Sequence, residues 1–382
     1  MSPRLLFVVT EDSFFCSHRL PIARAAKAAG FSVTVATRVG RFAGAIRNEG
    51  FDLAPFDIGR RGMNPFGEGV GVLRLAALYR RLRPDLVHHI AFKPIVVGSI
   101  AAKLARVPAV VNTFTGLGYM YSCEDARARL LRRPVETILR ACLGGAGRAV
   151  IVQNPDDREV IARVLGAPSD SLVLIRGSGV DPLGYPPSPQ RGGRVQVALI
   201  SRMLWPKGVG EFVAAAESLR PEFADVRFVL VGDTDDGNPQ AVPRERLKAW
   251  HAQGVVQWLG RRDDIPEILA ASHIVALPSS YGEGIPKILI EAAASGRPIV
   301  TTDTPGCREI VRDGENGLLV PKGRPDALAE ALRRLILDPE ARRRMGAAGR
   351  RIAQAEFSES RVVEETLAVY RSVLSRATIP GA

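Results

Sequence analysis

The chain alternates between short apolar runs and longer helical stretches from its first residues almost to its end. Continuous apolar runs of about four to eight residues are typical of strands that are buried on both faces. Helices between such strands cover both faces of a parallel sheet, so the alternation predicts an α/β fold with doubly wound, Rossmann-like domains. In the first half, the predicted strands are Arg4–Thr10, Ser32–Thr37, Asp52–Ile58, Asp85–Ile90, Pro108–Phe114, Ala149–Gln153 and Ser171–Ile175.

The segments between these strands have the apolar spacing of helices. Asn154 followed by Pro155 is a typical helix start, because asparagine caps the first turn and proline suits the first helical position. The predicted helices of the first half are His18–Ala29, Arg41–Glu49, Gly67–Leu82, Ile95–Ala105, Ala126–Leu143 and Pro155–Leu165.

One segment, Gly177–Arg194, interrupts the alternation. Its five glycines and four prolines are typical of a linker between domains. The pattern then restarts with strands predicted at Val195–Ile200, Val226–Val231, Val255–Leu259, His273–Leu277, Pro298–Thr302 and Gly317–Val320. We therefore predict a first domain over residues 1–178, a linker over 179–194, a second domain over 195–356, and a C-terminal segment over 357–382 whose helix returns to the first domain.

Composition and the spacing of cysteines argue against several other classes of protein. A chain of 382 residues with 46% hydrophobic residues can bury large cores. Its four cysteines stand apart from one another, so they indicate neither a disulfide framework nor a zinc site. The apolar start at Leu5–Val9 is too short for a signal peptide, and no uncharged apolar run approaches the ~20 residues of a spanning helix. The expected location is cytoplasmic.

The net charge of +12 is concentrated in the first half. Residues 1–180 hold 25 Lys and Arg against 14 Asp and Glu, whereas residues 181–382 hold 27 against 26. Such an excess is compatible with nucleic acid, an anionic membrane surface or a lipid that carries a diphosphate. Motifs that combine aromatic and basic residues for nucleic-acid binding are absent, and aromatic residues make up only 6% of the chain, so no nucleic-acid partner is expected.

The segment 126–143 is a basic amphipathic pattern that could meet a membrane. Its apolar residues fall on one helical face and its arginines on the rest, although Pro134 interrupts the pattern. Such a helix can lie on anionic lipid or can simply pack on the sheet, and both interpretations stay open. The apolar face consists of Leu130, Leu131, Val135, Ile138, Leu139 and Cys142, and the arginines are Arg127, Arg129, Arg132, Arg133 and Arg140.

The stretch Ser280–Glu291 carries the strongest functional signal. It follows the predicted strand His273–Leu277 with a glycine-rich bend, and Pro286 then suits the start of a helix that Gly296 ends. The first turn of a helix has backbone N–H groups without helical partners, which makes it a binding site for anions.

Two carboxylates accompany this anion site. Glu283 lies in the bend, and Glu291 lies within the apolar helix, where an unpaired charge is costly. Taken singly, Glu283 could be a solvated loop acid and Glu291 the buried partner of an arginine. Next to a phosphate site, both are suited to hold hydroxyl groups, and this combination predicts a nucleotide sugar as ligand.

A second loop supplies positive charge. Arg202 and Lys207 follow the predicted strand Val195–Ile200, at the end of the sheet where doubly wound folds bind ligands. An arginine can contact two phosphate oxygens at once, and a lysine acts as a point charge. Two surface cations would be the alternative, but the Glu283–Glu291 stretch in the same half favours a diphosphate site.

Taken together, these motifs resemble the GT-B retaining glycosyltransferases of family 4. The resemblance rests on Arg202, Lys207 and the spacing Glu283-x₇-Glu291 within GEGIPKILIEAAASGRPIVTTDTPGCREIV, and it covers almost the whole chain. It implies two domains that face each other across a cleft. It also implies that Arg202 and Lys207 hold the donor diphosphate, that Glu291 binds the ribose and that Glu283 contacts the donor sugar. The implied catalytic residues are Glu283, Lys207 and Arg202, and the implied donor site adds Gly260, Arg261, Gly284, Ile285, Pro286, Lys287, Ile288 and Glu291.

The first half is similar to bacterial enzymes that extend saccharides on polyprenyl diphosphate. The similar segments are SHRLPIARAAKAAG, NPF, HHIAFKP and NTFTGLGYMYS. Many relatives carry two glycines after the first strand, where this chain has Thr10–Ser13, and a histidine after the fifth strand, where it has Thr113–Gly116. The catalytic residue of the first domain is therefore not assigned. The candidates on the acceptor side are His18, Arg19, His89, Lys93, Thr115 and Gly116, and for each histidine a core or structural role is the alternative.

No metal or other cofactor is expected. The segment Asp233–Gly237 resembles part of a calcium loop but lacks the later bidentate glutamate, so an acidic turn is the better interpretation. The two cations Arg202 and Lys207 and the helix start can balance the charge of a departing diphosphate without a divalent ion.

The sequence thus predicts a retaining transferase that moves a hexose or N-acetylhexosamine from a UDP-sugar to a lipid-linked saccharide at the inner face of a bacterial membrane. A UDP-sugar epimerase with the same two-domain plan and a transferase to a soluble acceptor are the alternatives. An epimerase would convert the donor without any acceptor.

Overall fold

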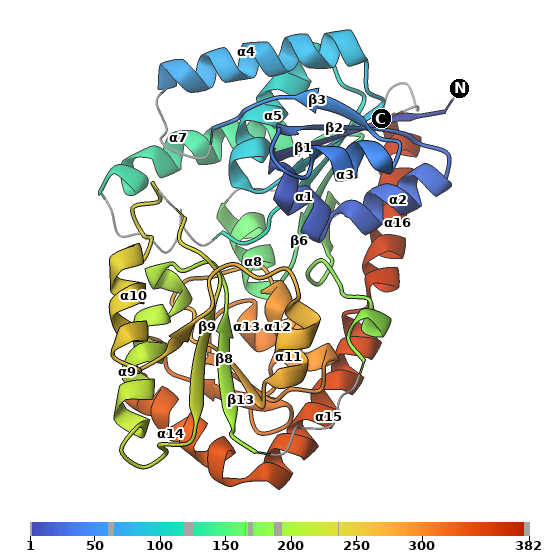
Figure 1. The fold of residues 1–382 in the computed structure, drawn as a ribbon. Helices are drawn as coiled ribbons and strands as arrows, with labels where there is room; N and C mark the ends of the chain where they lie inside the picture. Colours follow the sequence, from blue (N-terminus) through green and yellow to red (C-terminus); the bar gives the residue numbers. More distant parts are fainter. Residues whose placement is uncertain are drawn as a thin grey trace. The chain divides into compact units, whose positions relative to one another are not determined.

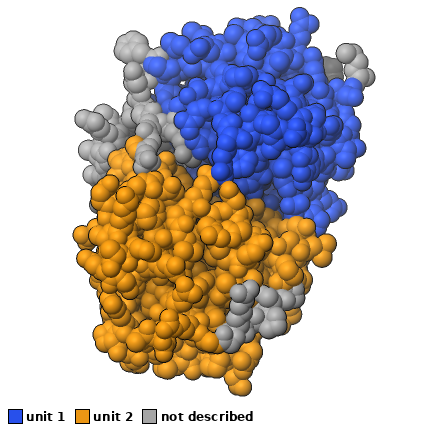
Figure 2. Space-filling view, viewed as in Figure 1, with its two compact units in different colours: residues 1–178, 359–382 blue, residues 179–358 orange. Residues whose placement is uncertain are grey.

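Two parallel sheets, each covered by helices on both faces, form the centres of the chain's two compact units (Figure 1). The computed structural model describes residues 2–59, 65–117, 126–164, 166, 171–186, 193–235 and 237–377. Unit 1 consists of Met1–Ser178 and Glu359–Ala382, and unit 2 consists of Gly179–Ser358 (Figure 2).

The sheet of unit 1 has seven parallel strands in the order β3-β2-β1-β4-β5-β6-β7. The direction of the strand order reverses between β1 and β4, which are hydrogen-bonded neighbours. The strands are β1 (Arg4–Glu11), β2 (Ser32–Arg38), β3 (Asp52–Pro55), β4 (Leu86–Ile90), β5 (Ala109–Thr113), β6 (Arg148–Val152) and β7 (Leu172–Leu174).

Alternate residues of β1 show how this sheet is buried. Successive side chains of a strand point to opposite faces. Phe7 belongs to one apolar cluster and Val8 to another, so the two faces have separate cores. The helices of unit 1 are α1 (Asp12–His18), α2 (Leu20–Ala28), α3 (Ala43–Asn48), α4 (Pro65–Leu82), α5 (Phe92–Ala105), α7 (Ala126–Leu143), α8 (Pro155–Val164) and α16 (Glu359–Ala377).

The C-terminal helix α16 packs on unit 1, as predicted. Its Tyr370 is fully buried and lies edge-on to Phe31, with ring centroids 6.2 Å apart. The Tyr370 hydroxyl is also 2.6 Å from Nδ1 of His88 in the same core. A segment that follows unit 2 in sequence therefore completes the core of unit 1.

Unit 2 repeats the same topology with six parallel strands in the order β10-β9-β8-β11-β12-β13. The strands are β8 (Gln196–Ile200), β9 (Arg227–Val231), β10 (Gln257–Trp258), β11 (Ile274–Leu277), β12 (Ile299–Thr302) and β13 (Gly317–Val320). The helices are η2 (Pro182–Gly184), η3 (Trp205–Lys207), α9 (Val209–Leu219), α10 (Arg244–Ala252), α11 (Ile265–Ala271), α12 (Lys287–Ala294), α13 (Cys307–Ile310), α14 (Pro325–Leu337) and α15 (Pro339–Glu356). The prediction of two doubly wound Rossmann-like domains is confirmed.

The start of the chain differs from the prediction of one helix over His18–Ala29. Two helices, α1 and α2, meet at Arg19, whose φ of −129° is not helical. Pro21 lies in the first turn of α2, where a missing N–H group is tolerated. The short helices α11 and α13 were not predicted either.

The segment 179–186 packs as part of unit 2. Val180 is buried in a unit 2 core, and its N–H donates to the carbonyl of Phe357 at 3.0 Å. Residues 187–192 of the predicted linker lie outside the described residues.

Helix α7 tests the membrane interpretation of the segment 126–143 in part. Val135 and Leu139 are buried in a core of unit 1, whereas Ile138 is 36% exposed. These two residues of the predicted lipid-facing stripe are therefore core residues, because the helix packs on the sheet. The side chains of residues 126–132 lie outside the described part. Among the described residues, no helix combines the length and the apolar character needed to cross a bilayer.

His89, one of the candidates on the acceptor side, lies in the core of unit 1. Its side chain is fully buried; Nε2 is 2.9 Å from the hydroxyl of Tyr79 and Nδ1 is 2.8 Å from Oδ1 of Asn112. Gly98 of α5 permits this packing, because a Cβ there would lie 2.4 Å from the imidazole. Burial lowers the pKa of His89 to about 4, although the hydrogen bond to Asn112 opposes this shift.

The buried imidazole predicts a loss of stability in mild acid. Below about pH 6.5 the unfolded chain protonates His89, whereas the folded chain resists protonation down to about pH 4. The free energy of unfolding therefore decreases as the pH is lowered through this window, by up to about 1.4 kcal/mol per pH unit from this residue. Urea unfolding of the His89→Gln variant should show a shallower dependence on pH than that of the wild type. A His251→Gln variant, which changes an exposed histidine of α10, serves as control. If the pH dependence of its unfolding free energy changes as much as that of His89→Gln, the effect does not come from the buried imidazole of His89.

Candidate active site

The carboxyl ends of β8 and β11 lie side by side in the middle of the unit 2 sheet. Ile274 of β11 pairs with Val197 of β8, and Val275 pairs with Ala198. The strand order reverses between these two strands, and such switch points are the usual ligand sites of doubly wound sheets. The loop with Arg202 and Lys207 follows β8, and the bend with Glu283 follows β11.

An ion pair joins these two loops. Nζ of Lys207, at the end of η3, contacts Oε2 of Glu283, and both side chains are largely buried, with 12% and 13% exposed. Ser279 donates a hydrogen bond from Oγ to the other oxygen of Glu283 at 2.8 Å. The Lys207 ammonium also lies 5.5 Å from the ring centroid of Tyr281. The structure thus brings together two of the predicted catalytic residues.

Electrostatics keep Lys207 charged despite its burial. Burial alone would lower the pKa of the ammonium, but the Glu283 carboxylate beside it outweighs this effect, and the pKa is raised. Burial also raises the pKa of Tyr281, which therefore stays neutral around pH 7. The pair supplies a fixed cation and a carboxylate with one oxygen held by Ser279.

Two glycines allow the loops to approach this closely. Gly208, with φ +76°, follows Lys207, and a Cβ there would lie 2.2 Å from the carbonyl oxygen of Pro278. Gly306, with φ +83°, lies after β12, and a Cβ there would lie 1.5 Å from the carbonyl oxygen of Gly284. Only glycine fits both the backbone angle and the space at these positions.

Arg202 has a different partner from Lys207. Its guanidinium lies 2.8 Å from Asp235, and its side chain is 49% exposed. Asp233 of the same acidic turn pairs with Arg244, also at 2.8 Å. Asp233 and Asp235 of this turn therefore form ion pairs with arginines. Asp236 lies outside the described residues. Across the part of the chain that the structure describes, no three His, Cys, Asp or Glu side chains cluster so as to hold a metal ion.

Glu291 lies in the second turn of α12 and is partnered. Nζ of Lys287 is 3.4 Å from its carboxylate, and the hydroxyl of Tyr185 donates a hydrogen bond to it. Burial and the adjacent Glu291 raise the pKa of Tyr185, so this hydroxyl keeps its proton. Tyr185 was missed at the level of sequence, because it lies in the glycine- and proline-rich segment and carries no spacing signal.

The start of α12 contains the other predicted donor residues. Pro286 precedes the helix and is buried with Gly284 and Ile285, whereas Lys287 and Ile288 are partly exposed. The helix points its first turn toward the same bend that holds Glu283. The positive end of the helix dipole therefore adds to the charge of Lys207.

Gly260 and Arg261 follow β10. The carbonyl of Gly260 accepts a hydrogen bond from the N–H of Gly232 at 2.8 Å, and Gly232 in turn abuts the carbonyl of Ser201. The loops after β8, β9 and β10 are thereby in contact. Arg261 is half exposed and lies 3.6 Å from Asp263.

The acceptor-side candidates of unit 1 occupy different environments. His18 stacks on Phe14 with ring centroids 4.3 Å apart. Arg19 is buried, Nε and one terminal nitrogen of its guanidinium have no hydrogen-bond partner, and burial lowers its pKa to about 10. Thr115 and Gly116 are half-buried in the loop after β5, and Lys93 lies in the first turn of α5.

Two protein families match the chain. The family described as "Glycosyl transferase 4-like" matches residues 4–154, within unit 1. The family described as "Glycosyl transferases group 1" matches residues 186–352, within unit 2. The second match includes the Lys207–Glu283 pair and all of α12.

Individual proteins are similar over most of the chain. The N,N'-diacetylbacillosaminyl-diphospho-undecaprenol alpha-1,3-N-acetylgalactosaminyltransferase of Campylobacter jejuni is 28% identical, over 97% of this chain and 99% of that protein. The alpha-maltose-1-phosphate synthase of Mycobacterium tuberculosis is 32% identical, over 75% of this chain and 79% of that protein. The Anabaena protein Alr3699/HepE, solved in complex with UDP and glucose, has a TM-score of 0.77 at 21% identity, over 96% of this chain and 99% of that one.

The close approach at Gly306 predicts a large effect of one methyl group. Gly306→Ala places a Cβ against the Gly284 carbonyl and should lower the free energy of unfolding by roughly 3 kcal/mol, because backbone strain and steric overlap add. Gly323→Ala is the matched control: Gly323 has a similar φ of +68° but open space around it, so only strain of about 1 kcal/mol is expected. Equal losses in urea unfolding of the two variants would contradict the proposed contact.

Proposed function

The chain belongs to the GT-B glycosyltransferases of family 4, and from that premise we propose that it transfers a hexose or N-acetylhexosamine from a UDP-sugar to a saccharide linked to polyprenyl diphosphate. The observation that carries the proposal is the Lys207–Glu283 ion pair at the switch point of unit 2. The similarity to the Campylobacter jejuni enzyme, whose name specifies a diphospho-undecaprenol acceptor, supports the acceptor class. The complex of Alr3699/HepE with UDP supports the donor nucleotide.

In this proposal the donor diphosphate lies between Lys207 and the start of α12. The ammonium keeps its charge and one oxygen of Glu283 is already held by Ser279, so a phosphate can share Lys207 without dismantling the loop. Arg202 is the second cation. Its ion pair with Asp235 is solvent-exposed, and such pairs contribute little, so Arg202 can turn to a phosphate at low cost.

The two carboxylates then bind the hydroxyl groups of the donor. Glu283 accepts hydrogen bonds from the sugar. Glu291 accepts them from the ribose, while Tyr185 and Lys287 hold its carboxylate in place. A carboxylate has about four acceptor sites, so these protein contacts leave capacity for both ribose hydroxyls.

We propose transfer with retention of the anomeric configuration. The bond between the sugar C1 and the donor phosphate oxygen breaks, the acceptor oxygen bonds to C1 on the same face, and the acceptor proton passes to the departing phosphate oxygen. This route needs no base from unit 1, which agrees with the structural role of His89. Lys207, Arg202 and the α12 start stabilise the charge that develops on the diphosphate.

The proposed place of action is the inner face of a bacterial cell membrane. The donor is a water-soluble metabolite and the acceptor is anchored in the bilayer, so the enzyme must work where the two meet. No nucleic acid takes part in this reaction.

The decisive experiment offers the purified protein a panel of nucleotide sugars with a lipid-linked saccharide. We expect transfer from a UDP-sugar, with product identified by mass spectrometry and its anomeric configuration by NMR. If the protein converts the donor alone into another nucleotide sugar, it is an epimerase. If it transfers sugar only to soluble saccharides, the acceptor class is wrong.

Single substitutions in the donor site should reduce this transfer strongly. Lys207→Ala and Glu291→Ala should each lower kcat/KM by roughly 100-fold or more, since each removes a charge that contacts the donor. Lys248→Ala and Glu330→Ala change exposed residues of α10 and α14 and serve as matched controls. Wild-type rates in either site variant with an intact fold would refute its assigned role.

Removal of divalent ions tests the expected independence from metal. The diphosphate charge is balanced by Arg202, Lys207 and a helix start, so transfer should be unchanged after treatment with EDTA. Loss of activity that returns with Mg²⁺ or Mn²⁺ would show that the protein's cations do not suffice.

A further inference from the structure

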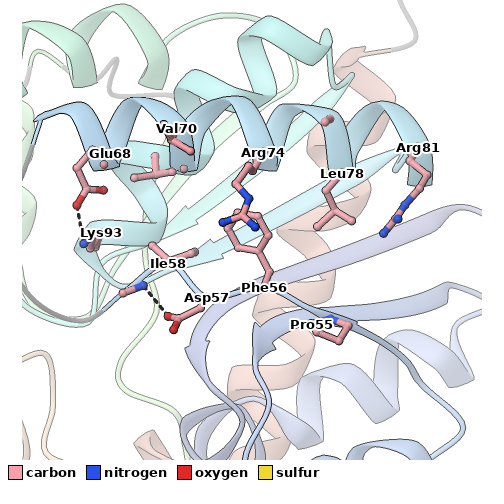
Figure 3. A pocket seen from close by; sticks show the side chains of 15 residues that line it. Pro55, Phe56, Asp57, Ile58, Glu68, Val70, Arg74, Leu78, Arg81 and Lys93 are labelled. Carbon is pink, nitrogen blue, oxygen red and sulfur yellow. Dashed lines mark hydrogen bonds and ion pairs between the residues drawn. The ribbon is translucent and has the colours of Figure 1, made fainter.

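Unit 1 contains a groove with a volume of about 810 Å³ (Figure 3). Its walls are one side of α4, the segment 55–59 that includes the end of β3, and the first two turns of α5. Ligand sites for small molecules typically have volumes of roughly 300–1,000 Å³. We name this cavity the α4 groove.

A single stripe of α4 forms its longest wall. Val70, Arg74, Ala77 and Arg81 recur every three or four residues, which places them along one side of the helix. Residues of the neighbouring side, such as Leu75, are buried in the core instead. The stripe is therefore presented to the groove and is not needed to hold the helix on the sheet.

Several of the lining side chains are apolar; Val70 is exposed, whereas Ile58 and Val97 are only 8% and 4% exposed. Val70 is 56% exposed although it lines the groove, and Phe56, Ile58 and Val97 face the same space from the other walls. A concave lining of apolar side chains with a few charged groups is typical of binding sites for small molecules. Apolar walls of this kind suit a hydrocarbon chain.

The charges of the groove are mostly positive. Arg74 and Arg81 are exposed and have no ion pair or hydrogen bond with any described residue. Lys93 is 2.6 Å from Glu68, and Asp57 accepts a hydrogen bond from the N–H of Gly59 at 2.7 Å (Figure 3). The two acids thus have partners, whereas the two arginines are available to an anion.

The end of the groove at Lys93 coincides with the carboxyl edge of the sheet. Segment 55–59 leaves this edge after β3, and α5 starts there directly after β4. Ala91, two residues before Lys93, has φ +74°, a conformation that is strained for a residue with a side chain and that tends to occur at functional sites. Ligands of doubly wound sheets bind at this edge.

We propose that the α4 groove binds the lipid diphosphate of the acceptor, with the first isoprene units against the apolar walls and the diphosphate at Arg74 and at Lys93, which shares its charge with Glu68. This inference rests on the proposed function and names the site for part of its acceptor. The groove pairs an apolar lining with unpartnered arginines, and a ligand with a hydrocarbon chain and a diphosphate satisfies both. Inorganic phosphate leaves the apolar walls unused, and a free saccharide leaves the arginines without an anion.

Direct binding tests the proposal without any transfer assay. Calorimetry with the full chain and farnesyl diphosphate should show binding that is at least about tenfold tighter than that of farnesol or inorganic pyrophosphate. Val70→Asp and Arg74→Glu should each weaken it by about tenfold or more. Both positions are exposed on α4, and Arg74→Glu tests the groove independently if Val70→Asp impairs folding.

Two substitutions on the same helix are matched controls. Leu73 is 64% exposed and Arg80 is exposed, yet neither lines the groove. Leu73→Asp and Arg80→Gln should therefore bind farnesyl diphosphate like the wild type. If Leu73→Asp weakens binding as much as Val70→Asp, the helix acts as a general lipid-facing surface and the groove proposal is wrong. Unchanged binding in both groove variants overturns it as well.

Kinetics separate this proposal from the proposed function. With a lipid-linked saccharide, the groove variants should raise KM for the acceptor by about tenfold, with kcat and KM for the UDP-sugar unchanged. A protein that binds farnesyl diphosphate in the groove but transfers no sugar to a lipid-linked saccharide refutes the proposed function and not the groove. Transfer with unchanged acceptor KM in the groove variants refutes the groove and not the function.

Discussion

The ion pair between Lys207 and Glu283 is the interaction on which the unit 2 site depends. Removing two charges from water is costly, and a buried pair often stabilises a fold no better than apolar side chains would. Here the surrounding structure is nevertheless adapted to the pair: Ser279 holds one carboxylate oxygen, and Gly208 lets the two loops meet. Since stability alone does not require charges at this point, a ligand that uses both of them is the better explanation.

The sequence predicted the sheets well because their strands are buried on both faces. Residues 5–9 of β1 and all of β11 are buried, and both segments are continuous apolar runs in the sequence. The break at Arg19 was missed for two reasons. Pro21 is compatible both with a helix that starts at His18 and with one that starts at Leu20. The preceding helix α1 also has no regular apolar stripe that would reveal it in the sequence. Short helices such as α13 are too brief to show a period.

The sequence did not predict the contacts that the proposed donor-site residues make. Arg202 and Lys207 lie five positions apart, yet the turn between them sends one to Asp235 and the other to Glu283. Tyr185 reaches Glu291 from a segment without any motif. In unit 1, the alternation of side chains along a strand could have predicted that His88 and His89 face different cores. Adjacent residues of β4 point to opposite faces, so His88 contacts Tyr370 in one core while His89 contacts Tyr79 in the other.

The two units share one topology but place their charges differently. At the switch point of unit 2, the cation and carboxylate are buried and held by neighbours, which suits a donor whose diphosphate must be positioned precisely enough for bond cleavage. In unit 1, β4 carries two buried imidazoles at the corresponding strand, and burial lowers the pKa of both, so neither bears charge near pH 7. Two of its exposed cations, Arg74 and Arg81 on α4, have no ion pair or hydrogen bond with any described residue. Such side chains suit the proposed lipid diphosphate, because that ligand has to be held but not broken.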